Sequence, residues 1–179
     1  MALSIYFFYD IYFVKKIDRE TKSYSENDLD FKNNTNNKIK NLQYNLNLNE
    51  NNQYKITSKF SELAQINGIE IVKMQKVEAK LTDNKKLPFL IIADEAEFNS
   101  SNYNTVFKNN VLIIYMNNKI LSDKLYLDLE NNMINIFHNV KYIGEYGTIN
   151  TDNISINLFT KKIDIFMNEN NRNVELIKN

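Results

Sequence analysis

Apolar and polar residues alternate with a period of two along most of the chain from Ile39 onward. In the first clear case, Leu42, Tyr44, Leu46 and Leu48 alternate with glutamine and asparagine, and the alternation is expected to resume at Tyr54, Ile56 and Phe60. Strict alternation is typical of a β-strand with one buried face, whereas an amphipathic helix needs a period near 3.6. No stretch of about ten residues in this region keeps the helical period. The body of the protein is therefore predicted to be all-β.

A repeat of 29 residues underlies this alternation. The segments IIADEAEFN, ILSDKLYLDL and INTDNISINLF place Asp94, Asp123 and Asp152 at equal spacing. The segments FKNNVLI, IFHNVKY and IFMNENN follow with the same shift, and a degenerate earlier copy is expected to begin at YKITSKFSEL, with Ser58 or Lys59 in place of the aspartate. Each strand has one apolar face, so a unit cannot bury itself and neighbouring units must stack.

The repeat predicts the fold class. Each unit is expected to be two strands joined by an Asn-rich turn, with turns at Asn99–Asn104, Glu130–Asn132 and Thr160–Lys162. Asparagine suits such turns because it tolerates the left-handed backbone and hydrogen-bonds locally. We therefore expect an elongated, twisted β-jelly-roll or open sandwich of repeated β-hairpins. A closed structural β-solenoid, whose repeats stack for length alone, is the alternative.

The start of the chain has a different character. Residues 2–14, ALSIYFFYDIYFV, are strongly apolar, but as a helix they would span about 20 Å of a hydrocarbon layer of about 30 Å. Asp10 interrupts the run, and Lys15 and Lys16 follow it. A short or truncated membrane anchor over residues 1–16 is the favoured interpretation, with a buried helix or strand as the alternative. Residues 17–38 are expected to form a polar tether, and residues 39–179 the β-domain.

Composition narrows the classes of function. The 179 residues carry 22 basic and 22 acidic side chains, so no net charge attracts nucleic acid. The chain has no cysteine and a single histidine, His138, which leaves no catalytic residues or metal ligands of the usual kinds. Calcium needs clustered oxygen ligands, so the single repeated aspartates are expected to be turn or edge residues that bond backbone N–H groups. A protein without enzymatic activity, metal or cofactor is expected.

With these features the chain resembles the LptC/LptA family of lipopolysaccharide-transport proteins. The resemblance covers about residues 39 to 178 and rests on NLQYNLNLNENNQYKITSKFSEL, on the strands around Ala93-Asp94 and Ser122-Asp123, on two Asn-Val pairs and on IDIFMNENNRNVELI. The order of an apolar N-terminus, a polar tether and repeated hairpins is most similar to LptC, the member anchored in the inner membrane. A soluble periplasmic shuttle similar to LptA is the second possibility within the family.

The resemblance implies a hydrophobic groove that accepts lipopolysaccharide from an inner-membrane ABC transporter. The lipid would pass to an LptA-like periplasmic protein through edge-to-edge sheet contact, with residues 149–177 as the candidate edge and no nucleic acid involved. The protein would be a single-pass inner-membrane protein with a periplasmic domain. The candidate groove residues are the apolar residues in phase on the repeated strands: Phe98, Phe107, Val111, Ile113, Leu125, Leu127, Ile134, Ile136, Val140, Tyr142, Ile154, Ile156, Ile163 and Ile165.

Overall fold

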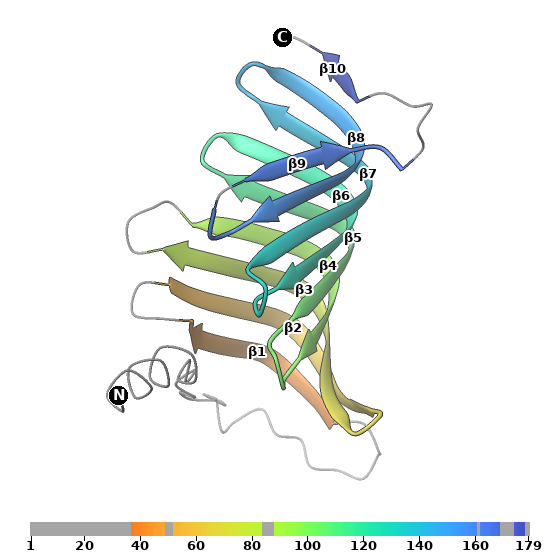
Figure 1. The fold of residues 1–179 in the computed structure, drawn as a ribbon. Coiled ribbons are helices and arrows are strands. Elements are labelled where there is room, and N and C mark those ends of the chain that lie inside the picture. Colours follow the sequence, from red (N-terminus) through yellow and green to blue (C-terminus); the bar gives the residue numbers. More distant parts are fainter. Residues whose placement is uncertain (1–36, 49–51, 84–87, 161, 169–173, 178–179) are drawn as a thin grey trace, which may run out of the picture.

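The computed structural model describes residues 37–48, 52–83, 88–160, 162–168 and 174–177, and these residues form one antiparallel sheet of ten strands (Figure 1). The strands follow one another as a meander, so that each of β1 to β8 pairs with the next along the chain. The strands are β1 (Asn37–Asn47), β2 (Asn52–Ile66), β3 (Ile69–Asp83), β4 (Phe89–Asn99), β5 (Thr105–Tyr115), β6 (Asn118–Asp128), β7 (Met133–Gly144), β8 (Gly147–Asn157), β9 (Ile163–Phe166) and β10 (Glu175–Ile177).

The sheet is open rather than closed into a barrel. Strand β1 forms one edge, and at the other end β9 and β10 both pair with β8, one after the other along its length. The all-β prediction is therefore confirmed. The described part of the chain contains no helix that is long and apolar enough to cross a membrane, and the predicted anchor over residues 1–16 lies outside the described residues, as does most of the predicted tether. Strand β1 begins at Asn37, two residues inside the predicted tether.

Each long strand bends in its middle. The ladders of β4 with β5, β5 with β6, β6 with β7 and β7 with β8 all contain a register shift there. At the bends of the odd-numbered strands the backbone takes positive φ angles, at Asn41, Lys76, Asn109, Asn110, His138 and Asn139. An extra residue on one strand forms a β-bulge, which bends the strand and increases its twist, and one class of bulge places a residue in the left-handed conformation.

The bends divide the sheet into two arms. Figure 1 shows that the strands curve over so that both sets of turns lie on the same side, and the sheet has the outline of a V. We define arm 1 as residues 42–58, 77–93, 111–122, 140–151 and 175–177, and arm 2 as residues 37–40, 60–75, 95–108, 124–137 and 153–166, without the undescribed gaps. Every ladder joins halves of the same arm, so described backbone hydrogen bonds do not join arm 1 to arm 2 away from the bends.

The space between the arms holds the hydrophobic core. Twenty-four buried apolar side chains from both arms form a single cluster, and the most deeply buried include Tyr54, Phe98, Phe107, Leu125 and Ile136. A side chain on a single sheet keeps one exposed face, so full burial means that the opposite arm covers it. The alternation of inward and outward side chains along a strand reverses phase at the bends. Beyond the bend of β2, Ser61 is buried and Phe60 is 44% exposed, so the predicted inward position of Phe60 is wrong.

The last repeat unit contains an insertion. Leu127 pairs with Ile134 in the second unit, and Ile156 pairs with Ile163 in the third, 29 residues later. Past the bend, however, Leu121 pairs with Lys141 whereas its counterpart Asn150 pairs with Glu175. Five more residues therefore lie in the third unit, between Asn168 and Val174. The predicted alignment of IFMNENN with IFHNVKY holds only for its first four residues, and the segment VELI completes the unit.

Candidate functional site

The predicted groove residues gather between the two arms. Eleven of them lie in the core cluster with exposures of 5% or less, and Tyr142 is partly buried against it. Ile163 and Ile165 on β9 continue the same inward-facing rows, because they pair with Ile156 and Ile154, but they are 57% and 37% exposed. The fully buried members are Phe98, Phe107, Val111, Ile113, Leu125, Leu127, Ile134, Ile136, Val140, Ile154 and Ile156.

Two contacts between strands that are not sheet neighbours hold the arms together. The Tyr54 hydroxyl on β2 of arm 1 hydrogen-bonds the Thr105 hydroxyl on β5 of arm 2 over 3.0 Å, and both residues are fully buried. The ring of Tyr44 on β1 stacks on the ring of Phe98 on β4, with centroids 4.9 Å apart. Burial raises the pKa of the Tyr54 phenol well above its ordinary value, and the bond with Thr105 opposes this shift only in part.

The two ends of the apolar interior differ. On the edge strand β1 the inward side chains Ile39, Leu42 and Tyr44 are all buried, with exposures of 9% or less. At the other end the inward residues of β9 are exposed, and so is Leu176 on β10, at 61%. Leu176 pairs with Ile149 as Tyr142 does on the other side of β8, so it belongs to the same inward row. The interior is thus closed at β1 and open at β9 and β10.

The repeated aspartates lie at the bends, so the expected position at turns or edges is wrong, whereas the expected bond with a backbone N–H is found for Asp152. Asp94 accepts a hydrogen bond of 2.6 Å from the side-chain amide of Asn110, and Asp123 accepts one of 2.6 Å from Asn139. In the third unit Asp152 accepts a bond of 3.0 Å from the backbone N–H of Asn168. Asp94 and Asp123 therefore tie their strands to the bulge of the next strand, and Asp152 ties β8 to the residue that follows β9 by two positions. We call this repeated arrangement the bend ladder.

Asp94 has a second partner besides Asn110. The Lys76 ammonium contacts its carboxylate over 2.8 Å. The hydrogen bonds from Lys76 and Asn110, together with the positive charge of Lys76, lower the pKa of Asp94 below its ordinary value. In the described part of the chain, acidic and histidine side chains do not gather in threes as a metal site would require. The ladder is built from carboxylate–amide bonds.

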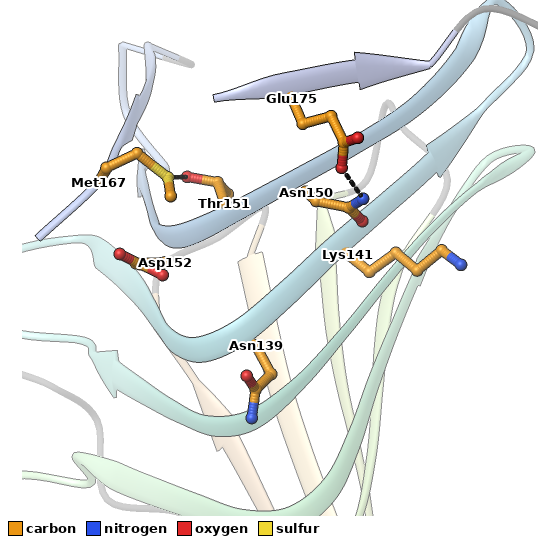
Figure 2. Close-up of a pocket in the computed structure, with 7 residues that line it drawn as sticks. All are labelled: Asn139, Lys141, Asn150, Thr151, Asp152, Met167 and Glu175. Atoms are coloured by element: carbon orange, nitrogen blue, oxygen red, sulfur yellow. Dashed lines mark hydrogen bonds between the residues drawn. The ribbon is translucent and has the colours of Figure 1, made fainter. Parts of the chain in front are cut away.

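A polar hollow of about 550 Å³ lies where β9 gives way to β10 (Figure 2). Asn150 donates a bond of 2.7 Å to the Glu175 carboxylate, and Thr151 donates one of 2.9 Å to the Phe166 carbonyl. Both bonds join β8 to the segments on either side of the hollow, which therefore lies between strands. Its lining residues are Asn139, Lys141, Asn150, Thr151, Asp152, Met167 and Glu175.

One apolar surface was not expected from the alternation. The outer face of arm 1 carries aliphatic side chains on neighbouring strands, although the same strands already bury their inner faces. The signal in the sequence is the continuous apolar runs 89–93 and 111–115, since strands buried on both faces lose the polar alternation. These outer residues are Leu90, Ile92, Leu112, Ile114, Leu121 and Ile143.

Comparison of the chain with models of known protein families and with curated proteins gives no match.

Proposed function

We propose that the protein is a lipid carrier of the lipopolysaccharide-transport type, in which acyl chains lie between the two arms. The observation that carries the proposal is the continuous apolar interior that runs from β1 to β9 and is exposed at one end through Ile163, Ile165 and Leu176. Acyl chains need a long apolar surface without directional polar contacts, and burial of such surface contributes about 25 cal/mol per Å².

The way the arms are joined supports entry of a lipid. Because the ladders run within each arm, the arms can separate without loss of described strand pairing. Separation breaks the Tyr54–Thr105 hydrogen bond and the stacking of Tyr44 on Phe98. It also exposes the core, and acyl chains that enter would replace the apolar contacts that the arms lose. The cost of opening is then largely offset in the loaded state.

In this proposal the N-terminal residues 1–16 anchor the chain in the inner membrane, and the β-domain lies in the periplasm. An inner-membrane ABC transporter supplies the lipid and the free energy. The open end at β9 and β10 passes the lipid to a periplasmic protein similar to LptA, through edge-to-edge pairing of strands. A soluble shuttle similar to LptA uses the same interior without an anchor.

A structural repeat array is the second candidate, and the burial of the core favours it. Eleven of the proposed lipid-facing residues are at most 5% exposed, as in a permanently closed sandwich. Such an array would have stacked units and a filled interior, and it would bind no lipid. The two candidates differ in whether an acyl chain ever reaches the inward face.

Photo-crosslinking tests this difference on one strand. A photoreactive residue replaces Ile165, which faces the interior, and in a matched variant it replaces Asp164, the neighbouring residue whose side chain faces outward. Both positions are exposed, so both variants should fold. With purified protein and lipopolysaccharide, the proposal predicts an adduct at position 165 and little at position 164. Equal labelling at both positions, or none at 165, would favour the structural array.

A further inference from the structure

The outer face of arm 1 carries a row of side chains that is complementary to the same row in reverse order. Strand pairing places Glu78 beside Ile92, Ile92 beside Leu112, Leu112 beside Leu121 and Leu121 beside Lys141. The row crosses five strands, a width of about 19 Å at the usual strand spacing. Three aliphatic residues lie at its centre with an acidic residue on one side and a basic residue on the other, and the pairing continues beyond them to Thr57 on β2 and Asn150 on β8.

Exposure of this aliphatic surface to water is unfavourable. Ile92 and Leu121 are 36% and 41% exposed, while Leu112 and the adjacent Leu90 and Ile114 are half-buried. The outer face of arm 2, on the same strands, instead carries charged pairs such as Lys108 with Glu97, which are 2.8 Å apart. A contiguous aliphatic patch that reaches solvent on the outer face of a sheet marks an interaction surface.

We infer that the outer face of arm 1 binds the same face of a second copy of this chain. A two-fold axis that runs parallel to β5 through Leu112 exchanges the two ends of the row. Leu112 then meets Leu112 of the second copy, Ile92 meets Leu121, and Glu78 meets Lys141. Face-to-face sheets pack with their strands nearly aligned, which such an axis produces. The interface is isologous, and each oppositely charged contact occurs twice.

The next row fits the same operation without like charges meeting. Pairing places Lys80, Leu90, Ile114, Lys119 and Ile143 side by side. The two-fold axis sets Lys80 opposite Ile143 and Lys119 opposite Leu90, so that each lysine stem covers an aliphatic side chain while its ammonium reaches water. Glu78 and Lys141 form no ion pair within the described part of the chain, so both remain available to the second copy. An anionic membrane surface would gain less, because Glu78 lies in the row itself.

Cysteine crosslinking of the full chain tests this arrangement, because the chain has no cysteine of its own. The variant Leu112→Cys is expected to form a disulfide-linked dimer on mild oxidation. The matched control is Val106→Cys, which places a half-buried outward residue on the same strand in arm 2. Circular dichroism verifies that both variants fold. The control is expected to stay monomeric.

A charge reversal tests the two-fold axis. Glu78→Lys in the Leu112→Cys background is expected to reduce crosslinking about tenfold, since like charges then meet twice. The further change Lys141→Glu is expected to restore it. Equal crosslinking at positions 112 and 106 would overturn the proposal, and so would charge reversal without rescue. Binding of the chain to anionic vesicles with no crosslink at position 112 would overturn it in favour of a membrane contact.

Discussion

The side-chain amide of Asn139 donates a hydrogen bond of 2.6 Å to the carboxylate of Asp123, across the bulge where β7 bends beside β6. The pair Asn110 and Asp94 has the same distance and the same separation along the chain, 29 residues earlier. Asn139 also has a φ angle of 52°, in the left-handed region. One residue type thus supplies both the backbone conformation that bends the strand and the amide that holds the bend.

Substitutions of Asn139 separate these two contributions. Asn139→Gly keeps an unstrained backbone and loses only the hydrogen bond, whereas Asn139→Ala also places an ordinary residue at positive φ. We expect Asn139→Ala to lower the free energy of unfolding by about 1 kcal/mol more than Asn139→Gly does. Urea denaturation of both variants measures the difference. Equal losses would show that the conformation at the bend does not select asparagine.

The Asp94 carboxylate gives the protein a component of acid sensitivity. Its pKa is lowered in the folded state by Lys76 and Asn110, so the folded state holds the proton more weakly than the unfolded state. The contribution to stability is present above the ordinary carboxyl pKa and is lost as the pH falls through the lower folded value. Asp94→Asn is therefore expected to flatten the fall in stability below about pH 4.

Lys76→Met serves as the partner variant for that measurement. It removes Lys76, the largest cause of the lowered pKa of Asp94. Like Asp94→Asn, it should flatten the fall in stability at acid pH, and the double variant should differ little from Asp94→Asn alone. Denaturation at a series of pH values gives all three curves. Additive effects of the two substitutions would contradict the assignment of the shift to this contact.

Tyr54 makes the protein sensitive to alkali. Its phenol has a raised pKa because it is fully buried, so above about pH 10 the unfolded state releases a proton that the folded state keeps. Stability should therefore fall as the pH rises above that value, by up to about 1.4 kcal/mol per pH unit from this group. Tyr54→Phe is expected to remove this part of the slope. It should also cost about 1 kcal/mol at neutral pH through the lost bond with Thr105.

Tyr142→Phe is the control for the loss of a tyrosine hydroxyl bond at neutral pH. This tyrosine is only partly buried, and its hydroxyl donates a bond of 2.8 Å to Asn118 within arm 1. It should lose a similar amount of stability at neutral pH through the lost bond with Asn118. The same alkaline slope in wild type and Tyr54→Phe would contradict the account of Tyr54.

The repeat predicts that one whole unit can be removed. Deletion of residues 118–146 joins Asn117 to Gly147 and lets β5 pair with β8 in the register that it has with β6. Because each strand pairs only with its neighbours in the meander, the shortened chain should unfold cooperatively, with its denaturant dependence reduced by about a fifth. Deletion of residues 118–132 reverses the direction of the following strands and should prevent folding. Failure of the whole-unit deletion to fold would contradict independent units.

Strands and inward faces could be predicted because they depend on local alternation. Ile134 and Ile136, for example, stand at period two, and the burial of both follows from their position on β7. The bends could not be predicted, because they depend on which asparagines adopt positive φ and the chain has 32 asparagines. The role of Asp123 depends on Asn139 across the ladder, 16 residues away.

The open end of the interior shows a second limit of the sequence. Ile165 has the same pattern around it as Ile136, yet it is exposed because it lies on the last strand of arm 2, and among the described residues no further strand pairs with β9 on its outer side. The insertion before Val174 was hidden by the similarity of its asparagines to those of the bulge in the preceding unit. The exposure of Ile165 and the place of the insertion become visible only once the strands are paired in the sheet.

The distance between a spin label on arm 1 and one on arm 2 measures directly whether the arms open when lipid binds. Labels on Lys55→Cys in arm 1 and Lys124→Cys in arm 2 occupy exposed outward positions on a chain without other cysteines. Dilution with unlabelled protein restricts the signal to single molecules. We expect lipopolysaccharide to increase the distance between the two labels by about 4 Å, the thickness of one further layer of carbon contacts. An unchanged distance at saturating lipid would contradict it and leave the interior as a closed core.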